Sequence, residues 1–323
     1  MPIRNKDGYV ANVGSAVKSR NGVFRQMANQ KYLIMLALPA FVLTLVFSYI
    51  PLAGWFIAFS DYQLGFSFFS GEWTGLKQFR LFFGETSDAF NIIRNTFAMN
   101  IMSLVGGLGI AFVFSLLIKE VASGKAKRLI QIITFFPYFM SWVILYSVIY
   151  SLFSTSSGAI NVFLVDIGIL KEGLNILGDK KYSWTLIVLV NIWNTLGYNS
   201  VIFLASISNV PADLYEAASI DGAGRLQKAI SITIPYMVPT LLVLFIMNSG
   251  WILNSGLDQY FVFTNPTNRP TMEVFDMYIY RYGIKLMNYS YATAVGIIKA
   301  IVSIVILYGV NMLSRRLSSR SII

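Results

Sequence analysis

The sequence predicts an all-α integral membrane protein with six transmembrane helices. Of its 323 residues, 56% are hydrophobic and only 12% are charged, whereas charged residues make up about 25% of a typical soluble domain. Several uncharged runs exceed the ~20 residues that a helix needs to cross the hydrocarbon core. These runs are continuously apolar and do not alternate with a period of two, so a transmembrane β-barrel is excluded.

The uncharged runs place the six predicted spans, in chain order, at about residues 32–60, 95–118, 129–153, 183–206, 236–257 and 290–313. The first run follows about 30 polar residues and is longer than the 7–15 apolar residues of a removable signal peptide, so we expect it to be retained. Only Lys299 interrupts the sixth run. Residues 31–316 are therefore predicted to form one transmembrane domain.

The distribution of basic residues predicts the orientation of the helices. The N-terminal segment, the connections 119–128 and 207–235, and the tail together hold 15 Lys and Arg residues against 5 acidic ones. Short cytoplasmic loops carry this excess, so both termini and the 207–235 connection are predicted to be cytoplasmic. Membrane topology thus accounts for the net charge of +10, and we expect no nucleic-acid partner.

Residues 1–30 are predicted to be a cytoplasmic arm and residues 317–323 a cytoplasmic tail. The arm carries scattered Lys and Arg, which suits contact with anionic lipid headgroups or simple solvation. The chain has no Cys and no His, which excludes thiol chemistry, disulfides, imidazole proton transfer and metal sites built from these ligands. We expect no catalytic residue, metal or cofactor on this chain.

Polar side chains inside two spans predict a lined pathway. Asn191, Asn194 and Tyr198 have the spacing of one helix face in the fourth span. In hydrocarbon such residues normally face a protein interior or a wet cavity, although hydrogen bonding between helices, worth about 0.6 kcal/mol on average, is the simpler alternative. With the matching residues of the fifth span, the candidates for a substrate pathway are Asn191, Asn194, Tyr198, Asn248, Trp251 and Asn254.

Lys299 lies near the middle of the sixth span. A lysine at the bilayer centre costs about 2.5 to 3.5 kcal/mol unless it pairs, snorkels or meets water. Its own helix offers no nearby acidic residue. Two interpretations remain open: a structural partner on another helix, such as a carbonyl or carboxylate, or an electrostatic contact with an anionic substrate. We include Lys299 among the pathway candidates on the second interpretation.

The connection 210–235 has the properties of a rigid segment to which another protein docks. We expect a short helix over 214–220 that carries Glu216, with Asp213 near its positive end. Asp221 and Gly222 should end it, and a second helix should run from Arg225 toward Pro235. Ala217 and Ala218 are small enough for a partner's groove to close over the first helix. An ordinary polar connector is the alternative.

The segment EAASIDGAGRLQKAISITIP, residues 216–235, resembles the EAA loop of ABC importer permeases of the carbohydrate, maltose-transporter-like type. The similarity extends over about residues 32–316, including Pro137 with Ser141, the segment 158–161, and Trp193 with Gly197. Ile234 stands where Leu is usual, a conservative departure. The segments 294–299 and 311–316 resemble permeases for complex, uronate-containing oligosaccharides such as alginate.

This resemblance implies a complex in the bacterial cytoplasmic membrane. Its other members would be a second, different permease subunit, a dimer of ABC ATPases and an extracytoplasmic solute-binding protein. The resemblance places Glu216, Ala217, Ala218, Asp221 and Gly222 in the cleft of one ATPase. ATP and Mg would bind to the ATPase, because this sequence contains no Gly-x-x-x-x-Gly-Lys-Ser/Thr segment.

The sequence therefore predicts a transport subunit for an oligosaccharide, acidic by the resemblance. Asn, Tyr and Trp suit sugars, because amides bind hydroxyls and aromatic faces pack on the ring, and Lys299 could contact a carboxylate. Alternatives are a neutral sugar or another small solute, an ion-driven secondary transporter, or a membrane scaffold that recruits an ATPase. Against the ion-driven transporter, we find no clear inverted repeat and no Asp or Glu inside a predicted span.

Overall fold

The computed structural model describes residues 30–67, 71–84 and 88–318. The predicted N-terminal arm lies outside these residues except for Gln30, and the predicted tail lies outside them beyond Ser318. The chain divides into two compact units, residues 1–54 and 55–323.

The first unit contains α2 (Lys31–Thr44), which continues as a π-helical turn over Leu45–Tyr49. A 3-10 segment, Ile50–Phe59, extends it to 29 helical residues in total. Hydrophobic side chains surround α2 on every side, as expected of a helix in a nonpolar environment. The helical segment therefore nearly coincides with the predicted span 32–60.

The second unit begins with a two-stranded antiparallel ladder followed by a short helix. Strands β1 (Ser60–Asp61) and β2 (Glu72–Trp73) pair with Ser60 opposite Trp73 and Asp61 opposite Glu72. The Trp73 ring stacks on Phe59 with 5.7 Å between ring centroids. Helix α3 (Lys77–Gly84) then buries Phe82 against α14 and α15, which are described below.

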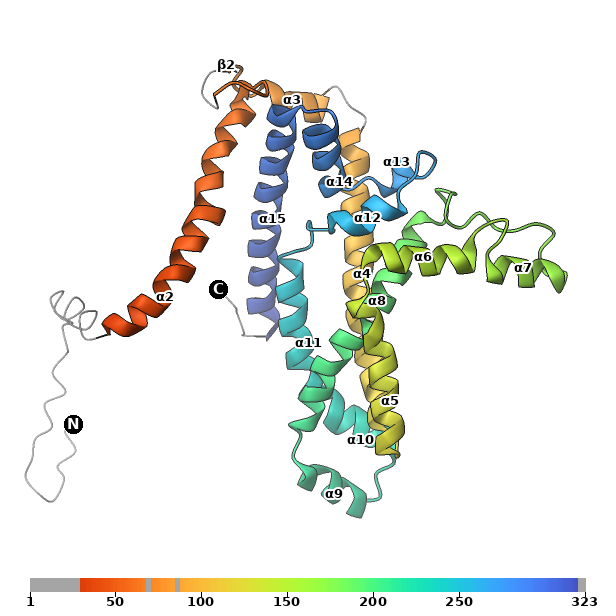
Figure 1. Ribbon diagram of the computed structural model, residues 1–323. Helices are drawn as coiled ribbons and strands as arrows, with labels where there is room; N and C mark the ends of the chain where they lie inside the picture. Colours follow the sequence, from red (N-terminus) through yellow and green to blue (C-terminus); the bar gives the residue numbers. More distant parts are fainter. Residues whose placement is uncertain (1–29, 68–70, 85–87, 319–323) are drawn as a thin grey trace, which may run out of the picture. The chain divides into compact units, whose positions relative to one another are not determined.

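Helices α4 (Asp88–Lys119) and α8 (Ser183–Ser208) pack along one another at the centre of this unit (Figure 1). Their core includes Leu108 and Phe203, joined by Met237 from α11, which is described below. The predicted spans 95–118 and 183–206 fall inside these two helices. Helix α15 (Tyr289–Ser318) contains the predicted span 290–313 and packs on α3, α11 and α14.

The third predicted span, 129–153, is a broken helix rather than a continuous one. Helix α5 (Gly124–Phe135) runs into a 3-10 turn, Phe136–Phe139, and α6 (Trp142–Phe153) leaves at 109°. Pro137 has no backbone N–H to continue the α-helical ladder. Met140 is extended, and the Ser141 hydroxyl caps the next helix by accepting from the Ile144 N–H at 3.4 Å. Helix α7 (Ala159–Asp166) follows.

The fifth predicted span, 236–257, is displaced toward the N-terminus in the structure. A continuous helical segment runs over Arg225–Ser249, made of α10 (Arg225–Lys228), a π-helical turn (Ala229–Thr233) and α11 (Ile234–Ser249). It ends eight residues before the predicted boundary. Gly256 has a φ of +81°, a conformation that helices do not contain and that glycine adopts readily.

The segment expected to be an outer connection between the fifth and sixth spans is packed into the second unit. It forms α12 (Leu257–Phe263), α13 (Arg269–Met272), α14 (Phe275–Tyr280) and a π-helical turn, Arg281–Lys285. Helix α12 packs on α6, and α13 packs on α4 and α8. The buried Asn95 amide on α4 donates to the carbonyls of Pro270 at 2.9 Å and Glu273 at 3.1 Å, which fixes this segment to the central helix.

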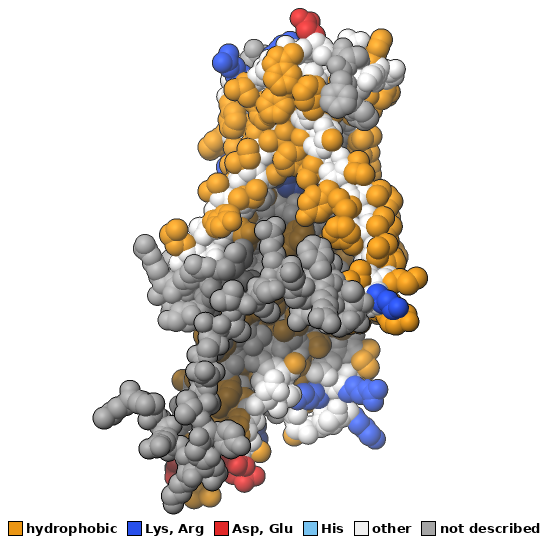
Figure 2. Space-filling model, turned by 90° about the vertical axis from the view of Figure 1, so that its left-hand side faces the viewer, with side chains coloured by type: hydrophobic (Ala, Val, Ile, Leu, Met, Phe, Trp, Pro, Cys, Tyr) orange, Lys and Arg blue, Asp and Glu red, His pale blue; other side chains and the backbone are white. Residues whose placement is uncertain are grey.

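The described residues include five helices long and apolar enough to cross a membrane, or six if the bent α5 and α6 pair is one span. Figure 2 shows hydrophobic side chains over much of the described part of one face, with Lys and Arg toward both the upper and the lower end of the view. This distribution fits helices in a lipid bilayer with charged ends in water.

Candidate functional site

A polar pocket of about 280 Å³ lies where two helices are broken. The break between α5 and α6 contributes Tyr138, and the turn after α11 contributes Trp251, Asn254 and Ser255. Irregular backbone at membrane depth is stable only where protein buries it or water lines it. The pocket therefore gives the irregular backbone at the two helix breaks the polar surroundings that it needs.

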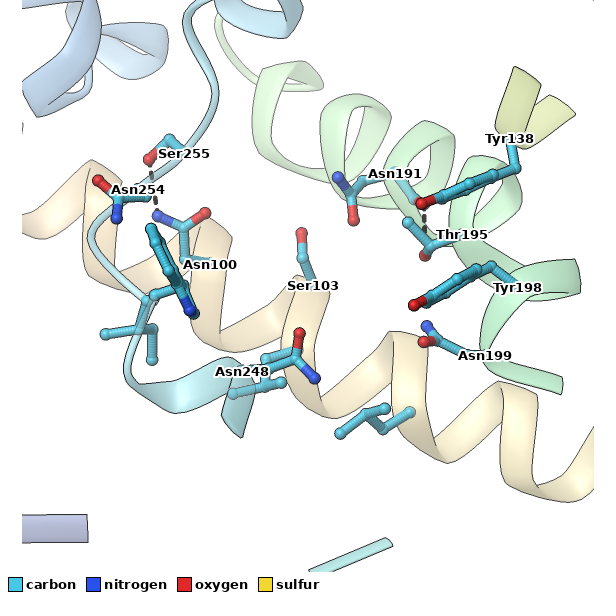
Figure 3. A pocket seen from close by; sticks show the side chains of 14 residues that line it. Asn100, Ser103, Tyr138, Asn191, Thr195, Tyr198, Asn199, Asn248, Asn254 and Ser255 are labelled. Carbon is cyan, nitrogen blue, oxygen red and sulfur yellow. Dashed lines mark hydrogen bonds between the residues drawn. The ribbon is translucent and has the colours of Figure 1, made fainter. Parts of the chain in front are cut away.

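Figure 3 shows how the polar side chains converge. Tyr138, Asn191 and Tyr198 approach from one side, Asn100, Asn254 and Ser255 from the other, and Ser103 and Asn248 lie between them. Among the described residues that line this pocket, none carries a charge. The pocket offers amide and hydroxyl groups beside aromatic rings.

The first wall depends on close contact between α5 and α8. Tyr138 and Tyr198 stack with 4.7 Å between ring centroids and 9° between ring planes, and their hydroxyl ends point into the pocket (Figure 3). A Cβ atom on Gly197 would lie 2.4 Å from the Phe135 Cα. Glycine at this position therefore lets the two backbones approach closely enough for the tyrosines to stack.

Hydrogen bonds orient the amide side chains of the pocket. The Asn100 amide donates to the Ser255 hydroxyl at 2.7 Å, and the Asn248 amide donates to the Leu244 carbonyl at 2.7 Å. The Asn191 amide donates to Gln259 Oε1 at 3.3 Å. These bonds orient the Asn side chains. Each amide keeps further donor or acceptor capacity, with which it could bind a ligand.

The structure brings five of the seven predicted pathway residues to this pocket. They are Asn191, Tyr198, Asn248, Trp251 and Asn254. Contact between these residues and a substrate stays a prediction. Asn194 is buried and donates to the Pro137 carbonyl at 2.7 Å, so in this structure it secures the helix break and does not line the pocket. Sequence reasoning did not select Asn100, Ser103 and Tyr138, although polar residues three apart in the second span were a usable signal.

Lys299, the seventh predicted residue, is paired elsewhere. Its Nζ lies 2.5 Å from Asp276 Oδ1, with side chains only 13% and 21% exposed. The other Asp276 oxygen accepts from the Ser255 N–H at 2.8 Å. The structure therefore supports the first interpretation of Lys299, a structural partner on another helix, which is the Asp276 carboxylate on α14. Through Asp276, this ion pair holds the turn that forms one wall of the polar pocket.

The predicted docking loop contains α9 (Ala212–Ile220), and Gly222 ends it. The Ala223 N–H donates to the Ala218 carbonyl at 2.8 Å, and the Gly222 N–H donates to the Ser219 carbonyl at 3.2 Å. This pair of bonds is the Schellman arrangement, which needs a left-handed residue at the position of Gly222, where φ is +77°. The glycine of the loop is thus explained by backbone geometry.

Three residues that sequence reasoning did not select anchor α9. The Lys119 ammonium at the end of α4 donates to Thr233 Oγ1 at 2.8 Å and lies 3.7 Å from the centre of the Tyr215 ring. The Tyr215 hydroxyl is 2.9 Å from the same Thr233 oxygen, which is fully buried. A force applied to α9 would therefore reach both α4 and the beginning of α11.

The outer surface of this loop is accessible and partly apolar. Glu216, Ala217, Asp221 and Gly222 are exposed and Ala218 is half-buried. Beside them, Ile220 is 87% exposed and Leu226 is 74% exposed. Apolar side chains grouped around a carboxylate are typical of a protein contact surface.

A helical bundle with a polar pocket at broken helices and an anchored, projecting helix is the architecture of a membrane transport permease. Comparison with known proteins agrees: residues 103–319 match the model of the family described as the binding-protein-dependent transport system inner membrane component. The chain belongs to this family.

Two relatives from Bacillus subtilis (strain 168) match almost the whole chain. Protein LplB is 33% identical over 97% of this chain and 96% of its own length. The polygalacturonan/rhamnogalacturonan transport system permease protein YteP is 35% identical over 94% of each chain.

Solved structures show the same fold. A chain of a bacterial alginate ABC transporter, crystallised in complex with an alginate pentasaccharide-bound periplasmic protein, superposes with a TM-score of 0.84. It is 31% identical, and the match covers 93% of this chain and 99% of that one. A second crystal structure, of a bacterial ABC transporter involved in the import of the acidic polysaccharide alginate, gives a TM-score of 0.83 at 31% identity.

Proposed function

We propose that this chain is the permease subunit of an ATP-driven ABC importer that passes an oligosaccharide across the bacterial cytoplasmic membrane. The observation that carries this proposal is the polar pocket at the two helix breaks. Its Asn amides can bind sugar hydroxyls, and Tyr138, Tyr198 and Trp251 offer faces for the apolar side of a sugar ring. Orienting polar groups among aromatic side chains are typical of small-molecule sites.

The acidic nature of the oligosaccharide is a finer part of the proposal. Similarity to a permease named for polygalacturonan and rhamnogalacturonan and to alginate importer structures supports a uronate-containing, alginate-like substrate. The uncharged polar pocket favours a neutral sugar as the second candidate. Uptake into proteoliposomes that contain the whole transporter separates the two, with radiolabelled trigalacturonate and its neutral galactose counterpart as substrates. Uptake of the neutral trisaccharide alone would reject the acidic proposal.

The proposed complex contains a second, different permease subunit, an ABC ATPase dimer and an extracytoplasmic solute-binding protein. In this arrangement the chain crosses the membrane six times, the broken α5 and α6 pair counting as one crossing, with both termini in the cytoplasm. The N-terminal segment, the connections 119–128 and 207–235 and the tail together hold 15 basic residues against 5 acidic ones, which supports this orientation. ATP and Mg bind to the ATPase, whose closure moves α9 and, through Lys119 and Thr233, the central helices.

We expect Tyr198→Ala and Asn248→Ala each to reduce transport by about tenfold, a loss of roughly 1.4 kcal/mol that is ordinary for one stacking or hydrogen-bond contact. The measurement is the initial rate of oligosaccharide uptake. Complex assembly, measured by size-exclusion chromatography, should stay normal. Tyr308→Ala is the matched control, because Tyr308 is exposed on α15 and does not line the pocket. Wild-type uptake in both pocket variants would remove these residues from the pathway.

Glu216→Lys is expected to weaken binding of the ATPase or to uncouple ATP hydrolysis from uptake. The exposed carboxylate on α9 is proposed to pair with an ATPase arginine, and reversing its charge replaces attraction with repulsion. We expect at least a tenfold fall in uptake per ATP hydrolysed. Glu172→Lys makes the same charge change at an exposed site far along the chain and should leave coupling unchanged. Normal assembly, hydrolysis and uptake in Glu216→Lys would contradict the docking role.

A further inference from the structure

A second pocket of about 340 Å³ lies along α12, α14 and the turn after α14. We call it the cationic pocket. Its principal lining residues are Phe261, Arg269, Glu273, Tyr280, Arg281 and Lys285. It differs from the polar pocket in chemistry, because three of these six side chains are cationic and one is anionic. In Figure 1, α12 and α14 lie in the half of the second unit away from α9.

One of the three cations is already neutralised. Arg281 Nε donates to Glu273 Oε1 at 2.6 Å, and Arg281 Nη2 lies 3.8 Å from Asp88. Burial raises the pKa of Glu273 above its ordinary value, and the Arg281 guanidinium opposes this shift. This ion pair is part of the pocket lining. Arg269 and Lys285 are exposed at the rim, and neither lies within 4.0 Å of a carboxylate of the residues that the structure describes. The side chains that line the pocket therefore carry more positive than negative charge, with Arg269 and Lys285 outside any ion pair of the described residues.

The same pocket presents aromatic faces and an unused hydroxyl. Phe261 and Tyr280 pack edge to face with 5.7 Å between centroids, and the Lys285 ammonium lies 5.4 Å and 5.8 Å from the two ring centres. Thr264 also lines the pocket, and its buried Oγ1 has no hydrogen-bond partner in the described part of the chain. A buried hydroxyl of this kind is normally satisfied by a partner.

We propose that the cationic pocket is a second sugar subsite, which binds the carboxylate of a uronate unit before the oligosaccharide reaches the polar pocket. Arg269 and Lys285 would attract the carboxylate, the Thr264 hydroxyl would bond a ring substituent, and Phe261 or Tyr280 would pack on the apolar face of the ring. This inference rests on the proposed import of an oligosaccharide and adds the place where its acidity is recognised.

The two pockets are joined by one short helix. Asn254 and Ser255, just before α12, line the polar pocket, and Phe261 on α12 lines the cationic one. Seven helical residues span about 10 Å at 1.5 Å per residue. Helix α14 contributes to both pockets. Its Asp276 accepts a hydrogen bond from the Ser255 N–H beside the polar pocket, and its Tyr280 lines the cationic pocket. One chain of linked sugar units could therefore extend from one pocket toward the other.

The test is the double variant Arg269→Gln/Lys285→Gln in the complete transporter. Direct binding is measured first, with trigalacturonate and its neutral galactose counterpart added to the purified complex in nanodiscs without the binding protein. We expect trigalacturonate affinity to fall about 3- to 10-fold, the range for losing two largely exposed charges. Neutral trisaccharide binding should be unchanged, and the wild-type preference for the charged sugar should shrink at high salt. In uptake, KM for the charged sugar should rise while kcat is unchanged.

The matched control is Lys171→Gln/Lys180→Gln, which removes two positive charges that do not line the cationic pocket. Equal losses for the charged and neutral trisaccharides would overturn the subsite. Unchanged trigalacturonate affinity together with a higher KM in uptake would also overturn it, and would assign the pocket to docking of an acidic surface of the binding protein. If the wild-type transporter imports no oligosaccharide at all, the proposed function itself fails, whatever the variants do.

Discussion

Asp276→Ala is expected to destabilise the permease by about 2–3 kcal/mol and to abolish most transport. The change leaves the Lys299 ammonium without its carboxylate partner at a site where the lysine is only 13% exposed. Removing one partner of a fully buried ion pair costs about 3–5 kcal/mol, and we expect a cost at or below the lower end of this range because both side chains retain some exposure. The change also removes the acceptor for the Ser255 N–H, so the turn that carries Asn254 loses its support.

Thermal unfolding of the purified complex measures the first effect, for which we expect a melting temperature lower by roughly 5 °C. The double variant Asp276→Ala/Lys299→Met separates charge from positioning. It removes the unpaired ammonium and should recover most of the stability, while transport stays low because Ser255 is still unsupported. A single variant Asp276→Ala with wild-type melting and wild-type uptake would contradict both roles of the ion pair.

Gly197→Ala is expected to cost about 3 kcal/mol, at the upper end of the range for overpacking a core. The new methyl group would lie 2.4 Å from both the Phe135 Cα and the Thr134 carbonyl oxygen. These are backbone atoms, so no side-chain rotation relieves the contact. Helices α5 and α8 must separate, and the stacked pair of Tyr138 and Tyr198 should separate with them.

Two measurements check this expectation: the yield of folded complex and the rate of uptake, both of which should fall strongly. Gly109→Ala is the matched control, because it also places a methyl group on a glycine within a long helix but meets no atom within 4 Å. We expect Gly109→Ala to be neutral or slightly stabilising. Equal behaviour of the two variants would show that close packing at Gly197 is not needed.

Local patterns were sufficient for much of the architecture. The apolar runs predicted helices close to α4, α8 and α15, because a helix that meets lipid must be hydrophobic along its length. The glycine after Ile220 predicted the end of α9, since the Schellman arrangement involves only residues 218–223. The spacing of Asn191 and Tyr198 placed both side chains on one face of α8, and both line the polar pocket.

The helix breaks were harder to predict. The third span was predicted as continuous although it contains Pro137, because the 109° bend depends on where α6 finds packing partners, among them α12. The end of α11 at Ser249 was missed because the residues after it, up to Leu257, remain uncharged. Hydrophobicity reports burial in lipid or protein and does not distinguish a membrane-spanning helix from a short helix packed inside the bundle.

By itself, the sequence determined the class of the protein, its long apolar helices and the short helix of the docking loop, because each depends on residues within a few turns of one another. The tertiary structure alone decided which polar residues meet. It placed Asn194 against the Pro137 carbonyl and away from the pocket, and it gave Lys299 its partner, Asp276, 23 residues away in another helix. It also grouped Arg269 and Lys285 into one pocket. The physical reason is that the pairing of charges and amides depends on distances in space, which the packing of broken helices sets and which no local periodicity contains.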